Sequence, residues 1–133
     1  MTQHKKYHII HLEDNPDVSE IMSVLFENED VLYEHVSSTE EAFDVLDKKI
    51  PHLVLVDLML IDDDDAIPGV EFIKQAYNKY TGIKMMVLSN RGDQSLKEEL
   101  APYIIGYEVK IFRPSIYKKQ LLELLQKMEE KNE

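Results

Sequence analysis

The chain has 133 residues, the usual length of one domain, and its 44% hydrophobic and 31% charged residues exclude the disordered and fibrous classes. Its formal net charge of -11 disfavours direct binding to nucleic acid or to an anionic membrane surface. Cysteine is absent and no apolar run reaches the ~18 residues of a membrane span, so we expect a soluble, cytoplasmic protein without disulfides or thiolate metal ligands.

Short apolar runs recur along the chain and predict five β-strands. These strands are expected at Tyr7–Leu12, Val31–Val36, Leu53–Val56, Lys84–Leu88 and Tyr107–Phe112. The third run stands in LVLVDLMLIDDDDAIPG and is apolar at every position before Asp57, as in a strand that is buried on both faces. A carboxylate at such a place destabilises the fold unless it is paired or bound to a metal ion. Asp57 is therefore a candidate functional residue.

Helical patterns lie between and after these strands. Asn15 and Pro16 favour the start of a first helix, and Ser38 with Glu41 forms a capping-box pair at the start of a second. The remaining helices are indicated by Ile73, Ala76, Tyr77 and Tyr80, by the weak pattern of Ser95 to Leu100, and, after Ser115, by Tyr117, Leu121, Leu124, Leu125 and Met128. Strands that alternate with helices predict one α/β domain over residues 1–133, with a doubly wound parallel sheet and helices on both faces.

In such a sheet, ligands bind beyond the carboxyl ends of the strands. Polar residues stand at these ends: Glu13 and Asp14 after the first strand, Asp57 after the third, Ser89 after the fourth and Lys110 on the fifth. We expect them to converge on one pocket. Taken alone, Glu13 and Asp14 are explained as well by a role in a turn or helix cap as by a functional role.

With these residues in this order, the chain resembles the receiver domain of two-component response regulators over nearly its whole length. The resemblance rests on Glu13 and Asp14, on Asp57 in VDLML, on Ser89, and on GYEVKIF with Tyr107 and Lys110. It implies a flavodoxin-like fold with strand order 2-1-3-4-5. It also implies a receiver that accepts a phosphoryl group on Asp57. No output domain is expected in this chain, which is therefore interpreted as a stand-alone receiver or as a fragment of a longer regulator.

The resemblance further implies a Mg2+ site. Asp14, Asp57 and the backbone carbonyl of Met59 are expected as direct ligands and Glu13 as a ligand through water, which suits an ion that prefers oxygen and retains several waters. The family more often has aspartate at the position of Glu13. Ser89 is expected to donate a hydrogen bond to a phosphoryl oxygen.

The resemblance also implies a positively charged side chain at the site, residues that transmit the phosphorylated state, and partner proteins. Lys110 is expected to pair with a phosphoryl oxygen, and Ser89 and Tyr107 to transmit the phosphorylated state. The expected phosphoryl donor is a sensor histidine kinase or a histidine phosphotransfer protein, and the phosphorylated state is expected to be recognised by a downstream protein target. A homodimer through the fourth helix, fifth strand and fifth helix is also allowed.

The segment VKIFRPS departs from the family, in which proline usually follows the lysine through a cis peptide bond. In the register that we choose, Lys110 is that lysine and Ile111 replaces the proline; in the other, Arg113 and Pro114 stand for the pair. A cis bond before a residue other than proline costs about 3 to 4 kcal/mol. We therefore predict a trans bond after Lys110.

The acidic run Asp62–Asp65 lies in a loop that is longer than in most relatives and ends at Pro68 and Gly69. A solvated, mutually repelling loop is the simpler interpretation, and a second cation site is the alternative. Its spacing does not match a calcium-binding EF-hand loop. His8 and His11, three residues apart on one strand, face opposite sides and are interpreted as structural or solvated.

Three functions fit this pattern. The first is a switch that catalyses only its own phosphorylation and dephosphorylation. The second is a receiver-like interaction module that takes no phosphate, although the acceptor and metal residues are complete. The third is a hydrolase with an aspartyl-phosphate intermediate, of the haloacid dehalogenase type, but that family has a second aspartate where this chain has Met59.

Overall fold

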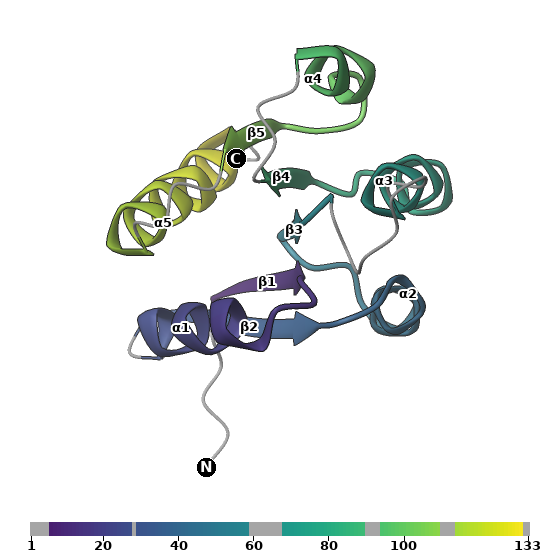
Figure 1. The fold of residues 1–133 in the computed structure, drawn as a ribbon. Helices are drawn as coiled ribbons and strands as arrows, with labels where there is room; N and C mark the ends of the chain where they lie inside the picture. Colours follow the sequence, from purple (N-terminus) through teal and green to yellow (C-terminus); the bar gives the residue numbers. More distant parts are fainter. Residues whose placement is uncertain (1–5, 28, 59–67, 90–93, 110–113, 132–133) are drawn as a thin grey trace.

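A five-stranded parallel sheet forms the centre of the computed structural model, which describes residues 6–27, 29–58, 68–89, 94–109 and 114–131 (Figure 1). The elements are β1 (Tyr7–Leu12), α1 (Pro16–Phe26), β2 (Val31–Val36), α2 (Thr39–Lys48), β3 (Leu53–Val56), α3 (Pro68–Lys79), β4 (Met85–Ser89), α4 (Gln94–Leu100), β5 (Gly106–Val109) and α5 (Pro114–Lys131). The strand order β2-β1-β3-β4-β5 confirms the predicted doubly wound, flavodoxin-like fold.

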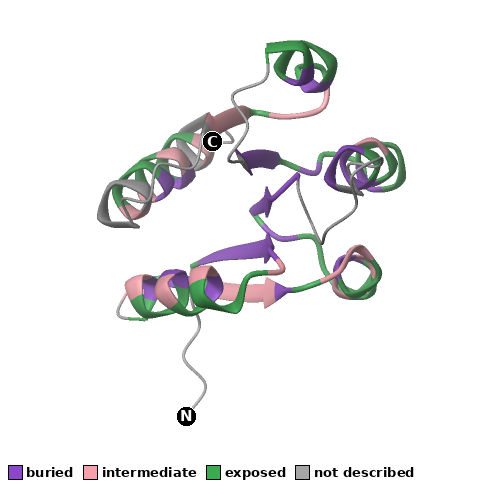
Figure 2. Cartoon of the chain, viewed as in Figure 1, coloured by how far each residue is buried: buried purple, intermediate pink, exposed green. Residues whose placement is uncertain are grey.

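The helices cover both faces of the sheet. Figure 1 shows α1 and α5 on one face and α2, α3 and α4 on the other. Residues alternate between these faces along each strand, so Ile9 and Leu55 join the cluster with α1 and α5, whereas Ile10 and Val56 join the cluster with α2 and α3. Strand β3 is fully buried, as Figure 2 shows by its colour, which agrees with its continuous apolar sequence.

The helix caps follow the sequence signals closely. Asn15 accepts a hydrogen bond from the Asp17 amide at 2.9 Å, and Pro16 occupies the first turn of α1. Ser38 accepts one from the Glu41 amide at 3.1 Å at the start of α2. The return bond of the expected capping box differs, because the Glu41 carboxylate accepts from the Ser37 amide.

The register of the sheet places three strand ends side by side. Leu12 pairs with Val36 on β2 and with Val56 on β3, and Val56 pairs in turn with Val87 on β4. The residues that follow these pairs therefore leave the sheet at the same edge. Strand β4 runs one residue later than expected and ends at Ser89.

Strand β5 begins one residue earlier than expected, at Gly106, because Met86 pairs with Gly106 in the ladder. Its predicted continuation through residues 110–112 lies outside the described residues. A Cβ on Gly106 would lie 3.4 Å from the Met86 side chain, which is flexible.

An interhelical contact joins α2 to the end of α3. The Tyr80 hydroxyl donates to the Asp47 carboxylate at 2.6 Å, and Lys79 lies 3.1 Å from the same oxygen. The hydrogen bond from Tyr80, followed by that from Lys79, lowers the pKa of Asp47 below its ordinary value. The Lys79 ammonium also lies 5.5 Å from the centre of the Phe43 ring.

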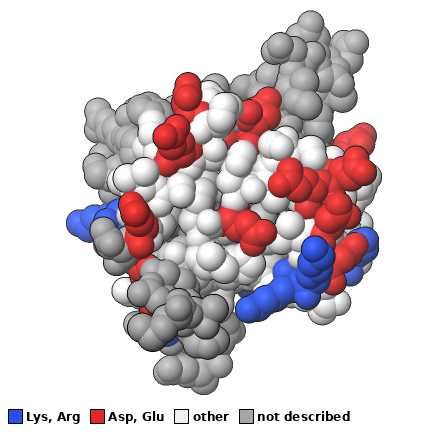
Figure 3. All heavy atoms as spheres, turned by 90° about the horizontal axis from the view of Figure 1, so that it is seen from below, with Lys and Arg blue, Asp and Glu red and all other residues white. Residues whose placement is uncertain are grey.

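The surface carries the negative charge that the composition predicts. Acidic side chains predominate on the face shown in Figure 3, and basic side chains gather mainly at one of its corners. This charge is unfavourable for a polyanionic ligand on that face. Within the described helices, none combines the length and the apolar character that crossing a membrane requires.

Candidate metal centre

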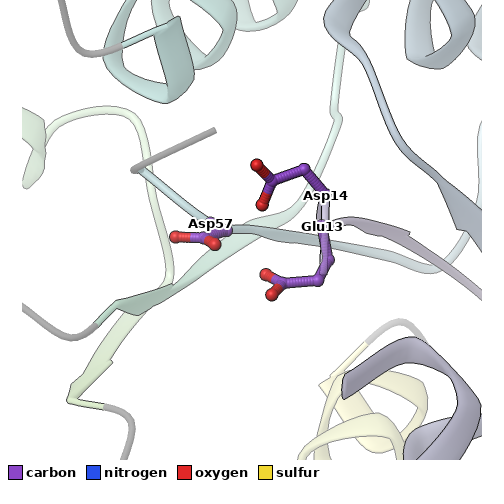
Figure 4. A group of neighbouring side chains, drawn as sticks. All are labelled: Glu13, Asp14 and Asp57. Carbon is purple, nitrogen blue, oxygen red and sulfur yellow. The ribbon is translucent and has the colours of Figure 1, made fainter. Parts of the chain in front are cut away.

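Three carboxylates meet at the carboxyl ends of β1 and β3. Glu13 and Asp14 follow β1 directly, and Asp57 follows β3. One oxygen of each can be chosen so that all three lie within 4.8 Å of one another. Figure 4 shows the carboxylates of Glu13 and Asp14 extending from their connecting backbone on the side where Asp57 lies. The predicted convergence of these residues is therefore seen in the structure.

Burial strengthens the electrostatic repulsion among these three carboxylates. Glu13 is 1% exposed and Asp57 6%, while Asp14 is half-buried. Like charges at this separation repel one another more strongly when protein replaces the surrounding water. A divalent cation relieves that repulsion, and carboxylate oxygens are the ligands that Mg2+ and Ca2+ prefer. The donor set thus fits a hard divalent cation.

The backbone holds the three residues through the sheet. The Glu13 amide donates to the Val36 carbonyl at 3.0 Å, which extends the contact between β1 and β2 by one residue. The Asp57 amide donates to the Leu12 carbonyl at 3.0 Å, which does the same between β3 and β1. Both acids therefore lie on restrained backbone rather than on a free loop.

Gly69, in the first turn of α3, brings that helix against the backbone of the site. A Cβ at this position would lie 2.6 Å from the Leu58 Cα and 2.7 Å from the Asp57 carbonyl oxygen. Its amide also donates to the Leu58 carbonyl at 3.4 Å. Only glycine permits so close an approach, so the residue that marks the end of the long loop in the sequence also positions α3 beside Asp57.

Two further predicted residues lie on neighbouring strands. Ser89 ends β4, two positions beyond the residue that pairs with Val56, and its side chain lies outside the described part. Tyr107 lies on β5, half-buried, and the Lys97 ammonium of α4 lies 5.6 Å from the centre of its ring. A cation over an aromatic face is attracted to it, so this contact links α4 to β5.

Several predictions fall on residues that the structure does not describe. These are the ligand Met59, the cation Lys110 with its trans bond to Ile111, the alternative pair of Arg113 with the Pro114 side chain, and the acidic run Asp62–Asp65. They stay predictions.

The histidines of β1 and β2 make buried contacts that the sequence did not indicate. His8 and His11 face opposite sides as expected, since His8 bonds to Glu34 and His11 to Tyr33. Both are buried, at 9% and 0% exposed, so the structural interpretation is correct and the solvated one is wrong. A residue that the sequence interpretation missed is His35, whose ring contacts the main-chain carbonyl of Glu13. Only its place next to the end of β2 could have indicated this contact.

Comparison with known proteins gives a family match. Residues 9–127 match the family model described as the response regulator receiver domain. Among curated protein sequences, none matches this chain significantly.

Solved structures with the same fold are numerous. A CheY-like response regulator receiver domain protein from Methanospirillum hungatei JF-1 has a TM-score of 0.81 at 18% identity, covering 94% of this chain and 98% of that one. The signal receiver domain of a putative Luxo repressor protein from Vibrio parahaemolyticus has 0.81 at 15%, covering 95% of each chain. The BeF3-activated N-terminal receiver domain of RstA from Klebsiella pneumoniae has 0.74 at 19%, covering 89% and 97%.

Proposed function

Because the chain belongs to the response regulator receiver domain family of two-component systems, we propose that it is a phosphorylation-controlled switch with Asp57 as its phosphoacceptor. The observation that carries this proposal is the cluster of Glu13, Asp14 and Asp57 within 4.8 Å at neighbouring strand ends. A single acid at a strand end has many explanations, whereas two buried acids with a third beside them favour a cation site.

The chain's own groups would hold Mg2+ at this place. Glu13, Asp14 and Asp57 would supply carboxylate oxygens and Met59 its backbone carbonyl. When bound, Mg2+ supplies positive charge that offsets the negative charge of a phosphoryl group brought to a carboxylate. Main-chain hydrogen bonds of Glu13 and Asp57 restrain the backbone that carries two of these carboxylates.

The reaction is a transfer from nitrogen to oxygen. A carboxylate oxygen of Asp57 attacks the phosphorus of a phosphohistidine on a sensor kinase or phosphotransfer protein. A P–O bond forms while the P–N bond breaks, and its electron pair returns to the imidazole nitrogen. Ser89 would donate a hydrogen bond to the transferred group, and Lys110 would neutralise part of its charge.

The phosphorylated state would be read at the face formed by α4, β5 and α5. Tyr107 lies on β5, in contact with Lys97 of α4. We expect the Tyr107 ring to change its environment on phosphorylation, so that a downstream protein, or a second copy of the chain, binds a changed surface. NMR signals of Tyr107 that do not respond to phosphorylation or to beryllium fluoride would contradict this coupling.

Intact-mass spectrometry with a small acyl phosphate tests the proposal. With Mg2+, wild type should gain the mass of one phosphoryl group and lose it slowly, and Asp57→Asn should gain none. The matched control is Asp44→Asn, which removes an exposed carboxylate on α2 and should be labelled like wild type.

The outcomes separate the alternatives. Absence of labelling in wild type favours an interaction module without phosphorylation, and rapid release of phosphate over many turnovers favours a hydrolase. Undiminished labelling of Asp57→Asn would show that another residue is the acceptor. Labelling that persists after chelation of divalent ions would show that phosphorylation does not require Mg2+.

A further inference from the structure

Polar side chains from β1 and β2 lie next to the acidic site. His35, the next-to-last residue of β2, contacts the main-chain carbonyl oxygen of Glu13 through Nε2. Tyr33, two residues earlier on the same face, shares a hydrogen bond of 2.6 Å with Nδ1 of His11. His11 is the register partner of His35. None of these three residues belongs to the metal centre described above.

The contact made by His35 acts on one particular peptide group. A carbonyl oxygen can only accept a hydrogen bond, so Nε2 of His35 is the donor. The carbonyl of Glu13 belongs to the planar unit that joins Glu13 to Asp14. Holding this oxygen fixes the orientation of that unit, and therefore the direction in which Asp14 leaves β1.

The main-chain ladder between β1 and β2 ends just before this point. Its last pair is Leu12 with Val36, and the Glu13 amide donates to the Val36 carbonyl. After Val36 the chain turns into the cap of α2, where the Ser37 amide bonds to the Glu41 carboxylate. The ring of His35 thus supplies a donor to β1 beyond the last main-chain pair.

We propose that His35 is a positioning residue of the acidic site, which holds the peptide group between Glu13 and Asp14 so that both carboxylates stay close to Asp57. As far as it concerns Mg2+, this inference rests on the proposed function. The restraint matters because the three carboxylates repel one another, and because Mg2+ requires near-ideal oxygen geometry.

The surroundings of His35 suit such a role. The residue is half-buried, so its hydrogen bond is partly sheltered from water, and its register partner His11 is fully buried. Tyr33 is held in place by a stacked contact with Phe26, with ring centres 5.9 Å apart. Burial, together with the nearby charge of Glu13, raises the pKa of Tyr33 well above its ordinary value. Tyr33 therefore stays neutral and adds no further negative charge.

Two substitutions at His35 test the proposal. His35→Phe keeps an aromatic ring but removes the donor, whereas His35→Gln keeps a side-chain N–H at a similar reach. Loss of one hydrogen bond predicts that His35→Phe binds Mg2+ about threefold to tenfold more weakly by calorimetry. In the metal-free protein, its Glu13 and Asp14 amides should exchange hydrogen faster by a similar factor. His35→Gln should restore most of both properties.

Tyr80→Phe is the matched control, because it removes the hydroxyl that donates to Asp47, at the ends of α2 and α3 and not at the carboxyl ends of the strands. It should leave Mg2+ affinity and the exchange of these amides unchanged. Wild-type exchange in His35→Phe, or a His35→Gln variant as defective as His35→Phe, would overturn the positioning role. Wild-type protein that fails to bind Mg2+ would refute the metal site itself, and the exchange measurement without metal distinguishes that result from a failure of His35.

Discussion

Replacement of Asp57 by Asn should stabilise the metal-free protein while removing its response to Mg2+. The substitution keeps the size of the side chain but deletes one of three charges that lie within 4.8 Å of one another. At that distance each pair of like charges repels by about 1 kcal/mol with the dielectric constant of water and by about 3.5 kcal/mol with an effective value near 20. Two pairs disappear, but Asp14 is half-exposed, so water screens part of its share of the repulsion.

We therefore expect a net gain of about 1 to 3 kcal/mol in the free energy of unfolding, measured in chelator. For a chain of this length that gain corresponds to a rise in Tm of roughly 3 to 12 °C. Saturating Mg2+ should cancel or reverse this difference. Wild type gains about 2.7 kcal/mol at a metal concentration of 100 times Kd, and Asp57→Asn should gain far less.

Thermal unfolding followed by circular dichroism gives the Tm of wild type and of Asp57→Asn, each measured in chelator and in Mg2+. Asp44→Asn serves as the control, because its carboxylate is exposed on α2 and outside the cluster. Its Tm should change little in either condition. The reasoning is refuted if Asp57→Asn is no more stable than wild type without metal, or if Mg2+ stabilises the two proteins equally.

Four further predictions concern other parts of the chain. Gly69→Ala should destabilise the fold by about 1 to 3 kcal/mol in urea unfolding, because its methyl group would overlap backbone atoms that cannot move cheaply, and an unchanged midpoint would contradict the close approach of α3. Lys110→Ala should weaken phosphorylation-dependent partner binding far more than Arg113→Ala, and the opposite order would favour the other register. Neutralising Asp62–Asp65 to Asn should lower Mg2+ affinity only about twofold to fivefold at low salt and less at high salt, whereas a salt-independent loss of a second bound ion would show a coordinating role. The fold lowers the pKa of Asp47, so the ionised Asp47 carboxylate stabilises the protein above the pKa of the unfolded state, about 3.9. This stabilisation is lost as the pH falls further. The Tm difference between wild type and Asp47→Asn should therefore shrink below about pH 4 rather than grow.

The fold and the acidic cluster were predictable because they follow from local patterns and one geometric rule. A buried apolar run with an acid at its end, as at Asp57, indicates both a central strand and the edge where ligands bind. Glu13 and Asp14 follow because parallel strands deliver their carboxyl ends to the same edge. Neither inference requires knowledge of side-chain packing.

The contacts that hold the site were not predictable in the same way. The bond of His35 to Glu13 depends on where β2 stops relative to β1, which is set by the cap of α2 and by register. The burial of His8 and His11 depends on partners from β2, namely Glu34 and Tyr33. Sequence periodicity shows which face a residue occupies, but not which polar group lies opposite.

The close approach of Gly69 to the backbone after Asp57 has a practical consequence for protein engineering. Leu58 and Gly69 are joined by a main-chain hydrogen bond of 3.4 Å, so the segment between them begins and ends at nearly the same point. Lengthening a segment whose ends are already closed costs only about 0.6 kcal/mol for each doubling of its length. A fluorescent or ligand-binding domain inserted between residues 62 and 65 should therefore leave the sheet intact, which makes this stretch of the sequence a suitable place to attach a reporter.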